Sequence, residues 1–478
     1  MLFNSVSFAF FLPAIFFLYW FVCRKELKIQ NALLLVASYF FYACWDWRFL
    51  FLLAFSTALD YYTGLKMEGA KSRQHKRGWL VLSVAINLGF LGLFKYYDFF
   101  AVSFSEFLSG FGLQVHPATL QVILPVGISF YTFHGLSYVL DIYRDKIKAE
   151  KNVIDYAVFV SFFPLLVAGP IERATHLLPQ IKRERTFDYT RAVDGLRQIL
   201  WGLFKKIVIA DQCAIYVDQI FDPSASYSGS TLLLGAVLFA FQIYGDFSGY
   251  SDIALGTARL LGIELLRNFA FPYFSRDIAE FWRRWHISLS TWFRDYVYIP
   301  LGGSKGNTWT TVRNILIIFL LSGFWHGANW TFLAWGLLNA IYILPAILRR
   351  THRDHLNIVA QGRVWPTWGE IGSISITFGL TVFAWIFFRA DSIGHAFRFI
   401  SSMFSASLWT LPQFMPWILF SLLILFILIE WSGREHPYAI QRLATAWNRP
   451  LRWAVYFVMI NLILLFFNQE QEFIYFQF

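Results

Sequence analysis

The chain has 478 residues, of which 57% are hydrophobic and 20% aromatic, while only 15% are charged. Soluble domains contain about 45–50% apolar and about 25% charged residues, so this composition excludes a large soluble core and predicts an all-α polytopic membrane protein. The net charge of +10 does not indicate nucleic-acid binding, because Lys and Arg occupy short loops between apolar runs, as in cytoplasmic loops of membrane proteins.

The start of the chain and its cysteines narrow the class of protein further. Residues 1–22 lack a basic start and a small-residue cleavage site, so we expect a retained helix and not a removed signal peptide. Cys23, Cys44 and Cys213 are scattered and have no metal-ligand spacing. We therefore expect neither a disulfide framework nor a metal site.

Apolar runs that could form membrane helices recur along the whole chain, since a bilayer-spanning helix needs about 20 mostly apolar residues. Two of them, 231–266 and 314–347, are long enough to bend or fold back. The full set is 1–22, 30–45, 48–65, 79–100, 120–141, 153–169, 193–221, 231–266, 314–347, 371–388, 414–431 and 453–468.

Basic loops between these runs predict the topology, because Lys and Arg concentrate on the cytoplasmic side. The first helix then runs from outside to inside, and the tip of the next hairpin, at 45–48, is outside. The loops 101–119 and 222–230 contain no Lys or Arg and are also expected outside. The aromatic C-terminal tail "EFIYFQF" is expected there too.

Two runs lie between basic loops that should both be cytoplasmic. We therefore predict that 153–169 is re-entrant or lies on the inner face, ending at "AGP" (168–170). We also predict that 314–347 rises, turns near "WHGANW" and returns, which places His326 deep in the membrane near the apex. Irregular backbone at that depth must be buried in protein or line a cavity.

The segment 278–300 mixes arginines with aromatic residues and is too charged to span lipid. It is typical of an amphipathic or re-entrant helix on the cytoplasmic side. The following "LGGSKGN" (301–307) predicts a glycine-rich turn.

His326 is the first candidate for chemistry. A neutral imidazole in an apolar setting is a general base that carries no charge at rest. Gly323 and Gly327 permit close approach of a substrate or another helix, and Trp325 and Trp330 could exclude water. The structural alternative is a buried histidine bonded to a backbone carbonyl between helices.

His286 is the second candidate. The neighbouring Arg283 and Arg284 would favour its neutral form. It could orient a substrate, or it could be a helix-face residue at the interface.

Other polar residues allow functional and structural interpretations. Asp246 and Asp252 lie in a long apolar run and should be paired, with Arg259 or Arg276 as the expected partner. A basic cluster could bind phosphates on the inner side, or could reflect positive-inside bias alone. Its members are Arg283, Arg284, Arg294, Lys305 and Arg313.

Seven segments together resemble the membrane-bound O-acyltransferase family, and in particular the membrane subunits of bacterial alginate O-acetylation. They are "NALLLVASYFFYACWDWRFL", "LPVGISFYTFHGLSYVLDIYR", "FPLLVAGPIER", "YGDFSGYSDIALGTARLLGI", "NFAFPYFSRDIAEFWRRWHISLSTWFRDYVYIPLGG", "GFWHGANWTFLAWG" and "FIYFQF".

The resemblance implies a fold of about 11 transmembrane helices, with re-entrant or interfacial helices, in a ring around a thin central tunnel. A single integral-membrane domain would cover 1–478, with its core at about 120–345. The family's catalytic histidine falls on His326 and its second histidine on His286. Asn339 departs from relatives that have a further histidine there. Tunnel or substrate contacts are expected at Trp325, Asn329, Asp246, Asp252, Arg283, Arg284 and Arg294.

The resemblance also implies the partners. The donor substrate is acetyl-CoA, with no bound cofactor and no metal. A periplasmic SGNH-type acetyltransferase would pass the acetyl group to an exported polysaccharide, and the chain would lie among lipids of the inner membrane. D-alanyl or other acyl transfer is the alternative within the enzymes. A transporter or flippase is the non-enzymatic alternative, although no internal repeat supports it.

Overall fold

The computed structural model describes residues 1–117, 119–120, 123–166, 169–467 and 473–474, with the side chains of 444 and 445 excepted. These residues form helices and connecting loops, and the described part contains no strand. They divide into two compact units, residues 1–192 with 258–266, and residues 193–257 with 267–478. The expectation of a single domain over 1–478 stays a prediction.

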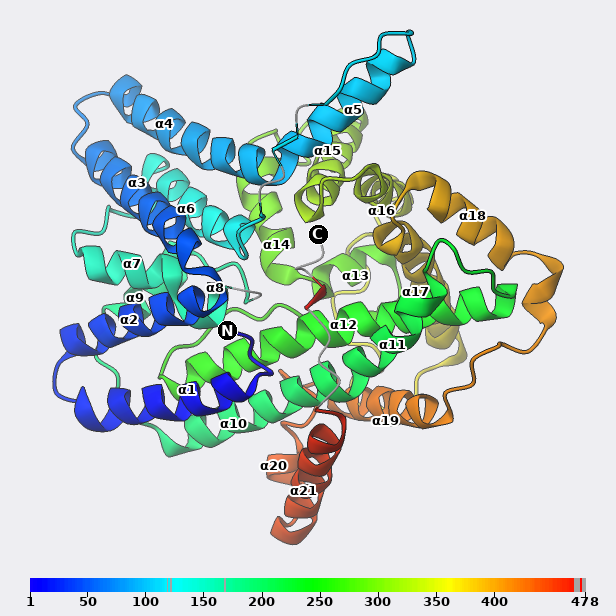
Figure 1. Cartoon of the computed structure of the whole chain (residues 1–478). Helices are drawn as coiled ribbons and strands as arrows, with labels where there is room; N and C mark the ends of the chain where they lie inside the picture. Colours follow the sequence, from blue (N-terminus) through cyan, green and yellow to red (C-terminus); the bar gives the residue numbers. More distant parts are fainter. Residues whose placement is uncertain (118, 121–122, 167–168, 468–472, 475–478) are drawn as a thin grey trace. The chain divides into compact units, whose positions relative to one another are not determined.

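The first unit is built around long apolar helices, of which α3, α4 and α6 pack against one another and α2 packs against α7 (Figure 1). Its elements are α1 (Val6–Phe17), η1 (Leu18–Val22), α2 (Leu27–Asp46), η2 (Trp47–Phe49), α3 (Leu50–Glu68), α4 (Arg73–Leu91), η3 (Gly92–Tyr96), α5 (Tyr97–Ser109), α6 (Ile128–Tyr143), α7 (Val153–Ser161), α8 (Phe163–Leu166), α9 (Ala174–Ile181) and the start of α10 (Tyr189–Leu203).

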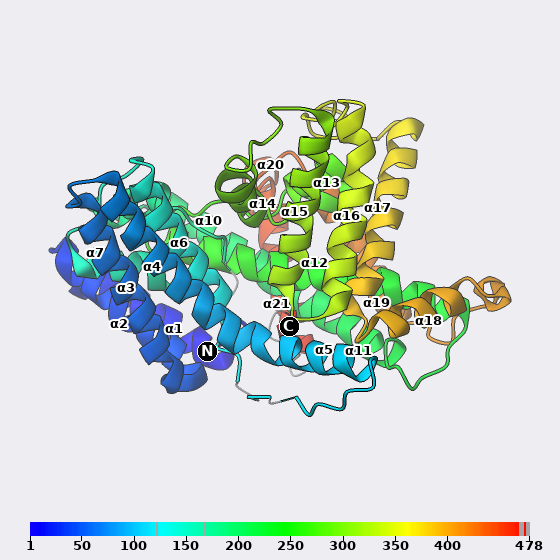
Figure 2. The same ribbon diagram turned by 90° about the horizontal axis from the view of Figure 1, so that it is seen from above.

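The second unit contains both candidate histidines. Its helices α15, α16 and α17 lie side by side (Figure 2). After α10 its elements are η4 (Phe204–Ala210), α11 (Asp211–Ile220), α12 (Gly229–Leu260), η5 (Pro272–Phe274), α13 (Ile278–Arg284), α14 (Ile287–Phe293), η6 (Arg294–Tyr298), α15 (Thr308–His326), α16 (Trp330–Leu348), α17 (Trp368–Arg389), α18 (Ile393–Met403), η7 (Ala406–Trp409), α19 (Trp417–Gly433), α20 (Leu443–Ala446) and α21 (Arg449–Phe466).

Seven helices of the described residues are long and apolar enough to cross a membrane, and two shorter apolar helices, Val6–Val22 and Trp417–Gly433, accompany them. The expected polytopic, all-α membrane fold is therefore confirmed, whereas a count of eleven spans is not. The ring and its central tunnel stay predictions.

The predicted hairpin over 314–347 is confirmed. Helices α15 and α16 are joined by a turn at 327–329, and each contains 19 residues. A Cβ at Gly323 would collide with the carbonyl oxygen of Phe332, so only glycine allows the two backbones this close. The preceding turn is also as expected, with positive φ at Gly302, Gly303 and Gly306.

Other predicted elements agree with the structure only in part or lie outside the described residues. Residues 153–166 form two short buried helices, α7 and α8, and neither is long enough to span a bilayer, as predicted for this run. A re-entrant or inner-face position for it stays a prediction. The expected loop 101–119 is helical as far as Ser109. The "AGP" end of the first run includes residues 167–168, which lie outside the described residues, as does most of the C-terminal tail.

Candidate functional site

His286 occupies a break in what the sequence predicts as one helix over 278–300. Helix α13 ends at Arg284, and His286 adopts the left-handed conformation, with φ of +42°, before α14 begins. Backbone bonds to a distant segment hold the break open: Ala270 N donates to the carbonyl of Arg284 at 2.9 Å, and Ile287 N donates to that of Asn268 at 2.9 Å. The single-helix prediction is wrong because these non-local bonds outweigh local helix propensity.

Asn268 also binds the site through its side chain. Its Oδ1 lies 3.1 Å from Nδ1 of His286 and accepts from Oγ of Ser288 at 2.9 Å. Its Nδ2 donates to Oγ of Ser251, on α12, at 3.2 Å. All four side chains are buried, so this is a polar network inside an apolar unit.

Burial determines the charge state of His286, which lies outside the candidate spans. The side chain is 1% exposed, and burial lowers the pKa of the imidazole to about 3. The sequence-based reason for a neutral imidazole, the charges of Arg283 and Arg284, is therefore wrong: the cause is loss of solvation. The alternative of a helix-face residue at the interface is also wrong.

His326 is the last residue of α15 and is buried among aromatic rings. Its ring centroid lies 4.9 Å from that of Trp325, 5.1 Å from Trp335 and 5.2 Å from Phe388. The ring of His286 lies 6.5 Å away. The break before α14 and the end of α15 thus bring together two histidines that are 40 positions apart in sequence.

Two asparagines near His326 form side-chain hydrogen bonds to other residues of the second unit. Asn329, a predicted tunnel residue, caps α16 by accepting from Thr331 N at 3.0 Å, and its Nδ2 donates to the carbonyl of Asp391 at 2.9 Å. Asn339 donates to the carbonyl of Trp335 at 2.8 Å. These bonds stabilise the helix ends and faces around the site, while a substrate contact of Asn329 stays a prediction.

The two aspartates of α12 are paired, as expected, but not with the expected residues. Asp246 lies 2.9 Å from Nζ of Lys206, and Asp252 lies 2.5 Å from Nζ of Lys205. The choice of an arginine was wrong because the lysines lie inside the apolar run 193–221. The two arginines pair with glutamates instead, Arg259 with Glu264 and Arg276 with Glu280.

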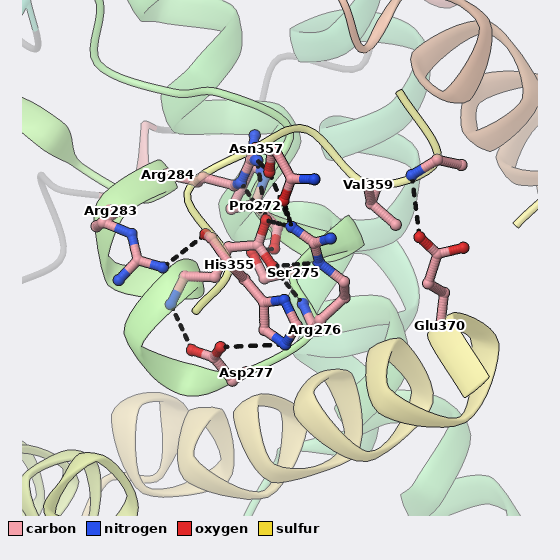
Figure 3. Close-up of polar contacts among 12 residues, drawn as sticks. Pro272, Ser275, Arg276, Asp277, Arg283, Arg284, His355, Asn357, Val359 and Glu370 are labelled. Atoms are coloured by element: carbon pink, nitrogen blue, oxygen red, sulfur yellow. Dashed lines mark hydrogen bonds and ion pairs between the residues drawn. The ribbon is translucent and has the colours of Figure 1, made fainter. Parts of the chain in front are cut away.

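Arg283 and Arg284 fasten the loop that follows α16 to α13 (Figure 3). Arg283 donates to the carbonyls of His352 and His355 at 2.6 and 2.8 Å. Arg284 donates to Glu280 at 3.0 Å and to the carbonyl of Asn357 at 3.1 Å. Both guanidinium groups therefore join α13 to the loop that follows α16. Their predicted phosphate contacts stay predictions.

Arg294 has a different setting, because it lines a cleft of about 730 Å³ in the second unit. Two further arginines, Arg350 and Arg353, line the same cleft, and neither guanidinium group has a hydrogen-bond or ion-pair partner among the described residues. Ile315, Phe319 and other apolar side chains of α15 and α16 form its wall. The cleft therefore combines a basic rim with an apolar interior.

Asn268 was missed by the sequence analysis. The asparagine stands 18 positions before His286 in an irregular stretch, and nothing in its local pattern pairs the two. Only the quoted segment "NFAFPYFSRDIAEFWRRWH", which begins at Asn268, joins them in one motif.

Comparison of the sequence with known proteins shows the family to which the chain belongs. The model of the membrane-bound O-acyltransferase family matches residues 43–388. A probable alginate O-acetylase of Pseudomonas aeruginosa is 42% identical over 416 residues, covering 86% of this chain and 76% of the relative. A peptidoglycan O-acetyltransferase of Helicobacter pylori is 36% identical over 432 residues (84% and 80%). A teichoic acid D-alanyltransferase of Streptococcus thermophilus is 28% identical over 314 residues (61% and 75%).

The family match covers both histidines, the α15–α16 hairpin and most of the candidate spans. These multiple apolar helices make the chain a multi-pass membrane protein. The chain belongs to the membrane-bound O-acyltransferase family and is an acyltransferase.

Proposed function

We propose that the protein is a membrane O-acetyltransferase that moves acetyl groups from cytoplasmic acetyl-CoA across the inner membrane for O-acetylation of an exported, alginate-like polysaccharide. The observation that carries the proposal is the buried pair of His286 and His326, with ring centroids 6.5 Å apart, inside an aromatic enclosure. The names of the alginate and peptidoglycan relatives support acetyl as the transferred group.

His326 would act as the general base. It takes the proton from the attacking hydroxyl as the oxygen bonds to the thioester carbonyl carbon. When the carbon–sulfur bond breaks, the proton passes to the leaving thiolate, so atoms and charge balance. A positioned base contributes about 10²–10⁴-fold to the rate. The surrounding rings of Trp325, Trp335 and Phe388 would exclude water that could hydrolyse the thioester.

The cleft rimmed by Arg294, Arg350 and Arg353 supports a phosphate-bearing donor, because guanidinium groups bind phosphate in a bidentate way. Its wall residue Phe319 precedes His326 by seven positions on α15, a rise of about 10 Å. The ring of Trp282 lies 5.3 Å from that of Phe319 and 5.7 Å from that of Trp335, which packs on His326, so the cleft wall continues into the aromatic packing of the site. A periplasmic SGNH-type acetyltransferase would receive the acetyl group and modify the polymer.

Acetyl-CoA consumption by the purified protein in nanodiscs tests this proposal. We expect labelled acetyl groups to leave acetyl-CoA, with release of the CoA thiol, when an acceptor is supplied. His326→Ala, shown to be folded by size-exclusion chromatography, should release almost none. An equal rate in this variant would contradict the proposed role of His326.

D-alanyl transfer is the second candidate, because a D-alanyltransferase is among the relatives. A parallel assay offers D-alanine loaded on a carrier protein. Transfer from that donor alone would replace acetyl transfer as the function, whereas transfer from acetyl-CoA alone supports the proposal.

A further inference from the structure

The hydrogen bonds around Asn268 fix the orientation of its amide. The backbone N–H of Ser288 lies 3.4 Å from Oδ1 of Asn268, and the hydroxyl of Ser288 donates to the same oxygen. A backbone N–H can only donate, so the amide atom that faces it is the oxygen. The opposite end, Nδ2, then donates to Ser251, which closes the arrangement.

This orientation fixes the tautomer of His286. Its Nδ1 lies 3.1 Å from the amide oxygen of Asn268, and two acceptors cannot form a hydrogen bond with each other. Nδ1 therefore carries the hydrogen, and Nε2 carries the lone pair. The second ring nitrogen of His286 is consequently an acceptor and cannot donate to a thioester carbonyl oxygen.

The acceptor nitrogen is buried and has no hydrogen-bond partner among the residues that the structure describes. Buried polar atoms are normally paired, because an unmatched one loses its bond to water without replacement. The ring centroid of His326 lies 6.5 Å from that of His286, so this acceptor belongs to a ring next to the proposed base. A substrate hydroxyl or amide N–H is the group that would satisfy it.

We propose that Asn268 is a positioning residue, which holds His286 as the Nδ1–H tautomer so that Nε2 accepts a hydrogen bond from a bound substrate. The bond comes from a hydroxyl or amide N–H other than the hydrogen that His326 removes. This inference rests on the proposed function for its kinetic consequence, although the tautomer itself does not depend on any activity. His286 would thus orient substrate, with Asn268 acting through it.

Nitrogen-15 NMR of histidine-labelled protein in nanodiscs tests the tautomer directly. The signals of His286 are those that disappear in His286→Gln. We expect Nδ1 to be protonated and Nε2 to be unprotonated at neutral pH. Nε2 protonated in the wild type would overturn the inference, whatever the outcome of the acetyl-transfer assay.

Asn268→Ala and Asn268→Asp test the consequence for turnover. Loss of the bond should lower kcat/KM about tenfold to a hundredfold in Asn268→Ala. The carboxylate in Asn268→Asp keeps an acceptor but stabilises the imidazolium, so the pH at which the nitrogen-15 signals of His286 titrate should move up by about one unit or more.

The matched control is Asn314→Asp, at a buried asparagine that donates to the carbonyls of Leu301 and Gly303. Its His286 titration should coincide with that of the wild type. An unshifted His286 titration in Asn268→Asp, or an equal shift in the control, would overturn the positioning role. No acetyl transfer by the wild type would instead contradict the proposed function and leave the NMR measurement to decide the tautomer.

Discussion

The polar cluster between α3 and α4 in the first unit and the histidine site in the second unit differ in how completely their hydrogen bonds are satisfied. In the first, Asp60 accepts from Ser83 at 2.6 Å and from Asn87 at 2.8 Å, and Asn87 accepts from Ser56 at 2.8 Å. Within the described residues, no atom of these four side chains is buried without a partner. In the second, Nε2 of His286 is such an atom.

This difference distinguishes buried polar groups that stabilise the fold from buried polar groups that bind a ligand. A closed network satisfies every donor and acceptor and joins helices inside apolar surroundings. A buried acceptor without a partner lowers the free energy of unfolding. Such an acceptor persists where a ligand supplies the missing hydrogen bond. We therefore expect changes in the first cluster to affect stability, and changes at the histidines to affect turnover.

The largest expected effect is that of His326→Ala. Because the imidazole is proposed as the general base, acetyl transfer per folded molecule should fall at least about a hundredfold. The rate is normalised to folded protein, because loss of a buried ring leaves a cavity that lowers stability, and His326→Gln, which keeps more of the side-chain volume, should lose activity with a smaller loss of stability. Loss of folding in His326→Ala and in His326→Gln alike would place this histidine with the structural cluster.

Asp60→Ala should produce the opposite pattern. The change removes the acceptor of the Ser83 hydroxyl and one of two acceptors of Asn87 Nδ2, which also donates to the carbonyl of Ser83. A buried donor left unmatched costs about 1–3 kcal/mol. Thermal unfolding in detergent should shift downward, while kcat per folded molecule should remain unchanged. Asp46→Ala, which removes an exposed pair with Arg48, is the control and should have little effect.

The buried imidazole of His286 should make stability sensitive to acid. Its folded pKa of about 3 lies below the ordinary value of about 6.5 that applies to the unfolded chain. Protonation therefore favours unfolding. The stability that the neutral imidazole contributes is fully present above about pH 6.5 and is lost as the pH drops towards 3. His286→Gln should show a shallower pH dependence of unfolding, and an identical slope would contradict the assigned burial.

Arg350→Ala and Arg353→Ala should have the smallest effect. If the cleft holds the donor's phosphates, KM for acetyl-CoA should rise about threefold to tenfold with kcat preserved, as for one exposed charge-assisted contact. Arg349→Ala, next to the cleft but not lining it, should match the wild type. Unchanged KM in both Arg350→Ala and Arg353→Ala would place donor binding elsewhere.

Sequence patterns predicted the structural features that depend on local properties of the chain. Basic residues at Arg313 and Arg349 required a hairpin between them, and the turn was expected near the tryptophans that flank it. Hydropathy likewise anticipated most of the candidate spans. His326 is predictable from sequence alone, because its motif resembles the family's catalytic one.

Contacts between distant segments could not be predicted in the same way. Nothing in "IAEFWRRWHISLSTWF" forbids a continuous helix, and the break at His286 depends on Asn268 and Ala270, which lie outside it. The lysine partners of Asp246 and Asp252 could not be predicted, because both lysines lie inside an apolar run. Arg283 and Arg284 looked like ligand-binding charges, although the carbonyls of a later loop take up their hydrogen bonds.

The most direct test of the central claim is the O-acetyl content of surface polysaccharide, measured by NMR, in a strain that lacks this gene. Complementation with the wild-type gene should restore the acetyl signals, whereas His326→Ala, present in the membrane at the wild-type level, should leave them absent. Full acetylation in the His326→Ala strain would contradict the account.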